Sequence, residues 1–578
     1  MCGLIGEINF DNSILNVNQF KSSIDFLENR GPDDSGHWKF ENIIQFGFRR
    51  LSIIDLDSRS NQPMLNNENK IAIVFNGEIY NFKEIKNNLK KKNIVFKTES
   101  DTEVILALYS NEGPNGLKKL RGMFSIAICD LDKKKVYFLR DPFGIKPLYY
   151  FYNQKRFIFS STVKSLLSFE IIKKKICKES LNFFHFFGSV KENQTIIEKV
   201  KSFEPGYLYE VDFDNNFSKK KLFDIEEIFS EKPKENLNVK EHFEKNLLRH
   251  VQSDVPVAIL LSGGLDSSAI LSYLIEKKID VTPFTLGFEE FKGIEDDEVT
   301  TSEKFCKLLG IKHNKIYLSN DEILDGLENF FKNMDQPSYD GLNTYLITKF
   351  LKNENFKVAI SGLGADELLG GYNTFFRMRF LHYLKFLYKN SLFKIFINFI
   401  NKIFKKNKYI IFFKLLSKYN NPYQIYLLLR SKKNNLHKIE KKYLENILTE
   451  KTEYSEMSLN DLTSLLEIKI YTKNQLLKDA DWAGMSNSVE IRVPFVDYDF
   501  LQVLKKSKFK INKGKKFFFK KLFNIPEFLM KKKKTGFKVP YKQIVDMYNK
   551  KYRTNFENWS EICLKEYFSS LNIKKNLL

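Results

Sequence analysis

The sequence predicts a two-domain protein, with a strand-rich N-terminal half and a C-terminal half built on a parallel α/β sheet with added helices. Three observations lead to this fold class. The chain has 578 residues, more than one hydrophobic core usually serves. Its first part, up to about residue 210, reads mainly as strands and turns. From about residue 240, buried apolar strands alternate with helical segments, as in parallel sheets.

In the N-terminal half, β-branched and aromatic residues predict strands at 71–80, 123–132 and 135–141. Helical segments interrupt them at 82–92 and at 102–111, where apolar residues recur at helical spacing. We therefore expect a first domain over residues 2–210, with strands packed on strands and a few helices.

Polar sequence at 211–239 predicts a linker, so the second domain is expected over 240–578. Within that domain, 255–275 reads as a buried strand, a glycine turn and a helix, and 281–288 and 355–371 repeat the step from strand to loop. Ligands of parallel sheets bind beyond the carboxyl ends of the strands, so these loops are where a site is expected.

The segment 375–420 is aromatic, basic and helical in period. A helix lying on a membrane surface is one interpretation. We favour buried helices whose lysines reach solvent along their aliphatic stems. No motif marks the tail after about residue 550.

Composition argues against several classes of protein. The chain has no run of eighteen apolar residues that would span a membrane and no secretory signal at its start. The cysteines lie far apart without a CxxC pair, which argues against a disulfide framework and a zinc site. They are Cys2, Cys129, Cys177, Cys306 and Cys563. We expect a cytoplasmic protein.

The net charge of +22 raises the question of a nucleic-acid or acidic-membrane partner. Lys, Asn, Ile and Phe are abundant along the whole chain, and a general bias in composition produces such a charge without any polyanion. We therefore expect small-molecule substrates, no nucleic acid and no stable membrane insertion.

Cysteine at position 2 is a candidate nucleophile. Removal of Met1 would give this residue a thiol of pKa about 8.5 and a free α-amine of pKa about 8. Together they make a nucleophile with its own base. The alternative is an ordinary residue at the start of an N-terminal strand.

The string SGGLDSS (262–268) follows an apolar strand and opens a helix. Gly263 and Gly264 permit an anion to approach the backbone, and N–H groups at a helix start can hold phosphate oxygens. Hydroxyls come from Ser262, Ser267 and Ser268, and Asp266 is a candidate magnesium ligand. The string resembles the pyrophosphate loop of ATP pyrophosphatases. The alternative is a Gly-Ser turn that caps a helix.

A second glycine-rich turn, SGLGADELLGGY (361–372), ends another predicted strand. Its Asp366 and Glu367 form an acidic pair that could complete a magnesium site beside pyrophosphate. Such a pair at a helix start is more often a cap.

Taken together, these motifs resemble the glutamine-hydrolysing asparagine synthetase family over nearly the whole chain. The N-terminal strings that carry the resemblance are MCGLIG (1–6), NRGPDDSG (29–36), RRLSIIDL (49–56), NQPM (61–64), FNGEIYN (75–81), ESD (99–101) and LRDPFGIKPLYY (139–150). The C-terminal strings are LLSGGLDSS, SGLGADELLGGY, SVEIRVPFVD (488–497) and KTGFKVP (534–540).

The resemblance implies a class II glutamine amidotransferase domain with the N-terminal-nucleophile αββα sandwich. Cys2 would attack glutamine to release ammonia, with Asn76 and Gly77 as oxyanion donors. Arg50 would hold the glutamine α-carboxylate, and Glu78 and Asp101 its α-ammonium. Leu51, Ser52 and Ile53, next to Arg50, are the remaining glutamine-binding residues that it implies.

For the synthetase domain, the resemblance implies ATP and Mg²⁺, an acyl-adenylate, an internal ammonia tunnel and a homodimer. The loops at 262–268 and 361–372 would bind ATP together with Leu260, Leu286, Ser361 and Gly362. Asp266 and Asp366 would lie near magnesium. Glu490 and Arg492 would border the acceptor site, or would form a structural ion pair.

Three positions depart from the family pattern. Leu363 stands where an acidic residue often supports formation of the aspartyl adenylate. Phe48 stands where a histidine often precedes the glutamine-binding arginine. Trp482 lies near a position that often carries a basic, phosphate-contacting residue, which Lys478 or Lys534 could replace.

The leading hypothesis is therefore synthesis of asparagine from aspartate, glutamine and ATP. Because of Leu363, a rival stays open in which the same chemistry amidates another carboxylate, such as a uronic-acid sugar. Cys2 argues against a β-lactam-forming relative, which lacks that cysteine. A basic binding protein with a dead enzyme fold predicts decayed motifs, whereas Cys2, Asn76, Asp266 and Asp366 are intact.

Overall fold

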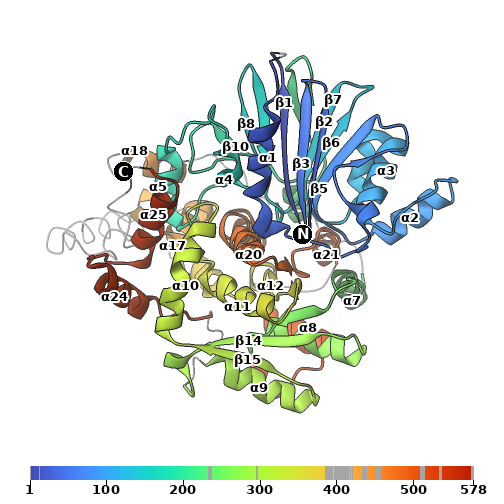
Figure 1. The fold of residues 1–578 in the computed structure, drawn as a ribbon. Helices are drawn as coiled ribbons and strands as arrows, with labels where there is room; N and C mark the ends of the chain where they lie inside the picture. Colours follow the sequence, from blue (N-terminus) through green and yellow to red (C-terminus); the bar gives the residue numbers. More distant parts are fainter. Residues whose placement is uncertain are drawn as a thin grey trace.

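The structure, a computed structural model, describes residues 2–11, 13–231, 233, 237–294, 297–383, 395, 415–416, 418–419, 421–432, 439, 441–449, 457–507, 514–532 and 537–573. Figure 1 shows the N-terminal half, in blue to cyan, as a stack of strands beside the sheet and helices of the C-terminal half. The described chain holds three sheets, two of six strands and one of five.

The N-terminal half is built on two antiparallel sheets. The strands of the first, in spatial order, are β10 (Val200–Ser202), β8 (Tyr149–Tyr152), β9 (Arg156–Ser160), β1 (Gly3–Asn9), β3 (Ile44–Arg50) and β2 (Asp34–Phe40). The strands of the second are β12 (Phe217–Lys221), β11 (Tyr207–Asp212), β7 (Lys135–Arg140), β6 (Gly122–Asp130), β5 (Ile71–Ile79) and β4 (Met64–Leu65). Alternate apolar residues of both sheets, such as Leu4, Phe46, Val74 and Phe138, share one buried cluster.

Helices cover the outer faces of this sandwich. α1 (Val17–Asp25) packs on the first sheet, and α2 (Phe82–Lys90) and α3 (Asp101–Gly116) cover the second. The Ser100 side chain caps α3 by accepting from Thr102 N, which places Asp101 at the helix start. The αββα sandwich and the three predicted strands are confirmed, as are both helices. Short helices α4 (Val163–Leu166) and α5 (Lys178–Phe187) follow β9.

The C-terminal half contains a five-stranded parallel sheet, as predicted. Its strands, in spatial order, are β15 (Asn314–Leu318), β14 (Thr282–Phe288), β13 (Val257–Leu260), β16 (Val358–Ile360) and β17 (Glu490–Arg492). Because all five strands run the same way, the loops after β13, β14 and β16 meet at one edge of the sheet.

Helices surround this sheet. They are α7 (Val239–His250), α8 (Leu265–Glu276), α9 (Glu298–Leu309), α10 (Asn320–Asn333), α11 (Leu342–Asn353), α12 (Ala365–Leu369), α19 (Leu459–Leu466), α20 (Leu477–Met485), α21 (Tyr498–Lys506), α22 (Lys515–Leu522), α23 (Glu527–Lys531), α24 (Tyr541–Tyr552) and α25 (Trp559–Ser570). A π-helical segment, Glu467–Leu476, joins α19 to α20. The described tail after residue 550 contains the end of α24 and the helix α25, and α25 packs on α10.

The linker expected at 211–239 is wrong for residues 211–221. These residues complete β11 and form β12, which pairs with β11 from Tyr207↔Lys221 to Val211↔Phe217. β12 is an edge strand with exposed lysines, and an exposed edge strand carries the polar residues that resemble a linker. α6 (Ile225–Ser230) then packs against α21. We propose residues 222–238 as the connection between the domains.

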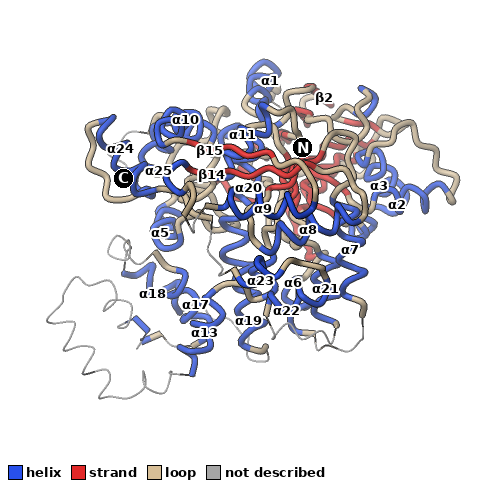
Figure 2. Tube along the Cα trace, turned by 90° about the horizontal axis from the view of Figure 1, so that it is seen from below, coloured by secondary structure: helices blue, strands red, loops and turns tan. Residues whose placement is uncertain are grey.

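The predicted helical segment 375–420 is only partly described. α13 (Asn373–Tyr383) packs on α17 (Pro422–Arg430), and α17 contacts α18 (Lys441–Thr449). Figure 2 shows these three helices together on one side, away from the strands. Most of 384–420, and with it most of this prediction, lies outside the described residues. No helix in the described parts of the chain has the length and apolarity to cross a membrane.

Candidate active site

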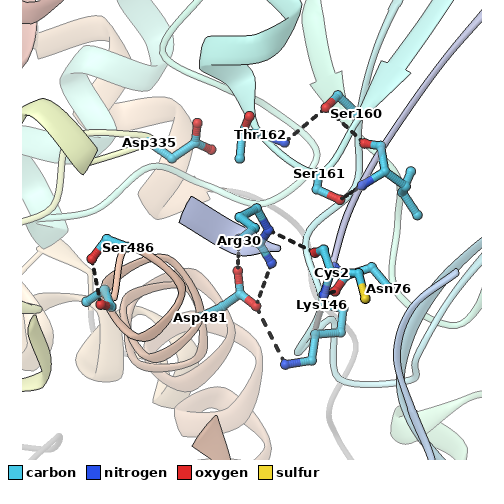
Figure 3. A network of polar contacts seen from close by, with 12 residues as sticks. Cys2, Arg30, Asn76, Lys146, Ser160, Ser161, Thr162, Asp335, Asp481 and Ser486 are labelled. Carbon is cyan, nitrogen blue, oxygen red and sulfur yellow. Dashed lines mark hydrogen bonds and ion pairs between the residues drawn. The ribbon is translucent and has the colours of Figure 1, made fainter. Parts of the chain in front are cut away.

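Cys2 is buried at the start of β1, with 8% of its surface exposed. Its backbone N donates to Asn76 Oδ1 at 3.1 Å, and its carbonyl accepts from Arg30 Nε at 3.1 Å (Figure 3). Burial raises the pKa of the Cys2 thiol, so the thiolate needs a base beside it to form. Removal of Met1 would make the backbone nitrogen of Cys2 a free α-amine, which can act as that base.

Asn76 and Gly77 lie next to one another on β5, beside Cys2. Asn76 is fully buried, and within the described residues its Nδ2 has no hydrogen-bond partner. Gly77 has a φ of +150°, and a Cβ there would lie 2.0 Å from the Met123 carbonyl oxygen, so no larger residue fits. A buried, unused amide donor beside a nucleophile is suited to stabilising an oxyanion.

A small cavity of about 40 Å³ opens beside Cys2. The predicted glutamine-binding residues Arg50, Leu51, Ile53, Gly77, Glu78 and Asp101 line it. Ser52 and Asn76 do not line the cavity. Ser52 N instead donates to Asp33 Oδ2 at 2.7 Å. Phe48 is buried in the core between the two sheets, in the same cluster as Cys2.

Charged groups of both signs face this cavity. The loop from Asp55 to Asn61 orients Arg50, whose Nη1 donates to Asn61 Oδ1 at 2.6 Å. Burial raises the pKa of Asp101 to about 6, although its carboxylate accepts from Ile79 N at 3.0 Å. Burial also raises the pKa of Glu78, whose Oε1 lacks a hydrogen-bond partner among the residues described. The pocket therefore offers an arginine and two carboxyls to a small zwitterion.

The C-terminal half completes this site through Arg492. The Arg492 guanidinium reaches Glu78 Oε2 at 3.0 Å and Glu490 Oε1 at 2.6 Å, and it donates to the carbonyl oxygens of His250 and Gln252. Although burial opposes ionisation, this guanidinium lowers the pKa of Glu490 to about 2. The sequence left Glu490 and Arg492 either beside the acceptor site or in an ion pair. The structure shows the ion pair, and through Glu78 it adjoins the cavity beside Cys2.

A second contact between the halves runs through Asp481 of α20. Arg30 Nη1 and Nη2 reach Asp481 at 2.8 and 3.2 Å, and Lys146 Nζ lies 3.6 Å from the same carboxylate. Figure 3 shows Arg30 between Cys2 and Asp481. Arg30 therefore holds the backbone oxygen of Cys2, and Asp481, a residue of the C-terminal half, orients Arg30.

A large cavity of about 570 Å³ lies at the carboxyl ends of β13, β14 and β16. Nearly all the predicted ATP and metal residues line it: Leu260, Ser262, Gly263, Gly264, Asp266, Ser267, Leu286, Ser361, Gly362 and Asp366. Ser268 does not, because it is fully buried one position further into α8. Gly263 has a φ of +59°, and a Cβ at Gly362 would lie 2.8 Å from Asp266 Cβ, so the two loops pack closely.

Lys515 at the start of α22 joins the two predicted metal ligands. Its Nζ lies 3.0 Å from Asp266 Oδ2 and also contacts Asp366 Oδ1. Lys532, 3.5 Å from Glu298 Oε2, lines the same cavity. Sequence reasoning missed both lysines. The one local signal for Lys515 was a glycine followed by consecutive lysines at 514–516.

Of the two basic residues suggested near Trp482, the structure places Lys478 away from the large cavity. Lys478 ion-pairs with Glu192 Oε2 at 3.3 Å and donates to the Val190 carbonyl, away from the 570 Å³ cavity. Trp482 is buried and donates through Nε1 to Asp479 Oδ1 at 2.8 Å. Lys534 lies outside the described residues. Among the described residues, Lys515, Lys516 and Lys532 are the lysines that line the 570 Å³ cavity.

Leu363 and Glu367, two further residues of the second glycine-rich turn, differ in whether they line the large cavity. Leu363 is half-buried and lines the large cavity. Glu367 does not line it, since the carboxyl is 1% exposed and accepts from Tyr372 OH at 3.0 Å. Burial raises the pKa of Glu367 to about 7. Glu367 is therefore not placed as a partner of Asp366 in a metal site.

A narrow cavity of about 30 Å³ lies between the two sites. It is lined by Arg30, which contacts Cys2, by Asp481, and by Asp479, which also lines the large cavity. The region between Cys2 and the phosphate-binding loops therefore contains a small, partly polar space.

Comparisons with known proteins agree with this arrangement. A profile of the glutamine amidotransferase domain matches residues 1–222, and one of asparagine synthase matches residues 238–561. The chain is 32% identical to asparagine synthetase [glutamine-hydrolyzing] 1 of Bacillus subtilis (strain 168), over 93% of this chain and 87% of that protein. It is 35% identical to asparagine synthetase [glutamine-hydrolyzing] 2 of the same organism, over 65% of this chain and 52% of that protein.

A solved structure of glutamine phosphoribosylpyrophosphate amidotransferase from B. subtilis, complexed with ADP and GMP, aligns at 13% identity and a TM-score of 0.30. It covers 56% of this chain and 92% of its own, and a score this low adds nothing to the argument. The two domain matches and the full-length relative are sufficient. The chain belongs to the glutamine-hydrolysing asparagine synthetase family, and it is a ligase.

Proposed function

We propose that this protein makes asparagine from aspartate, ATP and glutamine. The reaction has two halves, release of ammonia from glutamine and activation of the acceptor carboxylate by ATP. The observation that carries the proposal is the pairing of a buried Cys2 pocket with a separate 570 Å³ cavity at the SGGLDSS loop.

In the first half-reaction, the Cys2 thiolate attacks the side-chain amide of glutamine. With Met1 removed, the α-amine of Cys2 takes the thiol proton and passes it to the leaving ammonia. Asn76 Nδ2 and Gly77 N–H donate to the oxyanion. Arg50 binds the α-carboxylate of glutamine, and Glu78 and Asp101 accept from its α-ammonium. Water then hydrolyses the thioester to glutamate.

In the second half-reaction, an oxygen of the acceptor carboxylate attacks the α-phosphorus of ATP and pyrophosphate leaves. Ammonia then attacks the acyl carbon and AMP leaves. The glycines and serines at 262–268 hold the phosphates, with Lys515 and Lys532 as the cations that match the charge of pyrophosphate.

Mg²⁺ fits this cavity. Asp266 and Asp366 converge on one Lys515 ammonium, so they lie close enough to share a cation, and carboxylates are the oxygen ligands that Mg²⁺ prefers. We assign Mg²⁺ to these two carboxylates, where it would offset the charge of the leaving pyrophosphate.

The ammonia released at Cys2 is proposed to reach the acyl-adenylate inside the protein. The narrow cavity between the sites supports this route, since its lining includes Arg30 at one end and Asp479 at the other. The described cysteines are all free, which fits a reducing compartment. We therefore propose that the enzyme is cytoplasmic. We also propose that it is a homodimer.

A second acceptor is kept as an alternative because of Leu363. This residue lines the large cavity but offers no charge or hydrogen bond to an aspartyl adenylate. A uronic-acid sugar would be amidated by the same two half-reactions. The two candidates differ in what surrounds the reacting carboxylate, a charged amino-acid end or a ring of hydroxyls.

An acceptor screen tests the proposal. The protein is given glutamine, ATP and magnesium with one carboxylate at a time, and pyrophosphate and AMP are measured. We expect release of both with aspartate. Release with a uronate and none with aspartate would replace asparagine synthesis with the alternative.

A further inference from the structure

A polar cavity of about 170 Å³ adjoins the large cavity, and the two share Asp340. It lies between the chain after α5 and the end of α17. Its polar lining consists of Ser189, Tyr339, Asp340, Arg430, Lys432 and Gln475, together with Tyr471. A space of this size admits several water molecules or one small polar solute. The two half-reactions proposed above place no part of a substrate in this cavity.

The two cations of this cavity differ in their partners. Arg430 is neutralised by Glu467, which it contacts through Nε at 3.1 Å and also through Nη2. Lys432 Nζ has no carboxylate within 4 Å among the described residues, and it lies 3.4 Å from the centre of the Tyr339 ring. Burial lowers the pKa of Lys432 to about 8. The carboxylate that acts on Lys432 is Asp340, which lies more than 4 Å away and so leaves room for an anionic ligand at the ammonium.

Asp340, a negatively charged residue, lines both the 170 Å³ cavity and the large cavity. Asp340 accepts at Oδ1 from Gly341 N at 2.9 Å, and no cation lies within 4 Å of its carboxylate among the described residues. Burial raises the pKa of Asp340, and Gly341 N–H, the more distant Lys432 and the Tyr541 side chain counter part of that rise. Asp479 accepts from Ser338 Oγ at 2.7 Å and lies close to Asp340. Burial, and then the charge of Asp340, raise the pKa of Asp479 to about 8. An ammonium group placed at Asp340 would relieve this repulsion.

We propose that this cavity binds the amino-acid end of the acceptor, with Lys432 on its α-carboxylate and Asp340 on its α-ammonium. The side-chain carboxylate then points past Asp340 into the large cavity, where it attacks the α-phosphorus of ATP. This inference rests on the proposed function and specifies how aspartate is chosen. A uronic-acid sugar has one carboxylate, which is consumed in the reaction, and leaves Lys432 without an anion.

The test measures the KM for aspartate in aspartate-dependent pyrophosphate release. Lys432→Met removes the charge, and we expect the KM for aspartate to rise at least tenfold, while the KM for ATP and glutamine hydrolysis change less than twofold. Lys432→Arg keeps the charge and should recover most of the loss. Lys432→Gln serves if the methionine variant does not fold. Lys349→Met, on the exposed face of α11, is the matched control and should behave as the parent.

A second arm tests Asp340. Succinate has both carboxylates of aspartate but no ammonium, so its inhibition constant should be the same for Asp340→Asn and the parent, whereas the KM for aspartate rises. An unchanged KM for aspartate in Lys432→Met, or an arginine variant as impaired as the methionine variant, would overturn the inference alone. No release with aspartate by the parent protein would overturn the proposed function itself.

Discussion

Replacing Arg492 by methionine tests whether the C-terminal half sets the charge of the glutamine pocket. Arg492 is fully buried and holds Glu78 and Glu490 at 3.0 and 2.6 Å. Methionine keeps much of the side-chain volume but removes the guanidinium from both carboxylates. Breaking a buried pair in this way costs about 3–5 kcal/mol of stability. We therefore expect a lower melting temperature.

The effect on glutamine binding follows from Glu78. Burial raises the pKa of Glu78 and the Arg492 guanidinium lowers it, so removing the guanidinium raises this pKa further and weakens the charge that Glu78 offers to the α-ammonium of glutamine. A hydrogen bond to a charged group contributes about 1.5–3 kcal/mol. Its loss raises the KM for glutamine roughly 10- to 150-fold, since about 1.4 kcal/mol corresponds to a factor of ten.

The assay compares glutamine-dependent and ammonia-dependent pyrophosphate release in the same preparation. Arg492→Met should raise the KM for glutamine and leave the KM for ammonia within twofold. The KM for glutamine of Arg492→Lys should lie between those of Arg492→Met and the parent protein. In a double-mutant cycle, Arg492→Met should cost less stability when Glu78 is already Gln. A folded Arg492→Met protein with an unchanged KM for glutamine would refute the reasoning.

Four further predictions concern single residues. Cys2→Ala should abolish glutamine use and leave ammonia-dependent synthesis, and loss of both would contradict separate sites. Gly77→Ala should lower glutaminase kcat and stability, because its Cβ would lie 2.0 Å from Met123 O, and an unchanged rate would count against the placement of β5. Lys515→Met should raise the KM for ATP at least tenfold without changing glutamine hydrolysis, checked in parallel assays. Burial raises the pKa of Asp101 to about 6, so its carboxyl protonates below that pH and kcat/KM for glutamine should fall there; Asp101→Asn should flatten that limb of the profile.

Local patterns predicted the two-part organisation and the glycine-rich loop at 262–268, whereas the residues around Cys2 were implied by the resemblance to the family. The sandwich strands carry their β-branched residues in short runs, and the SGGLDSS loop has its glycines and Asp266 within seven residues of sequence. Ser268 shows the limit of such patterns, because one helical step past Ser267 turns its hydroxyl into the core. The linker was misjudged because the exposed edge strand β12 has the same polar composition as a loop.

Contacts between distant segments could not be read from the sequence. Lys515 lies 249 residues from Asp266 and 149 from Asp366, in a lysine-rich stretch that looks like solvated surface. Arg492 and Glu78 are 414 residues apart, and only the packing of β17 against the N-terminal half brings them together. Lys432 belongs to no motif, and its role is proposed from the cavity into which the fold places it.

The central claim is that nitrogen released at Cys2 is delivered to aspartate activated by ATP. Glutamine labelled with ¹⁵N in its side-chain amide, supplied with aspartate, ATP, magnesium and unlabelled ammonium, tests it in one mass spectrum. The account predicts asparagine that carries ¹⁵N in its amide in excess of what mixing with the free ammonium allows. Labelled glutamine consumed without any labelled asparagine would contradict it.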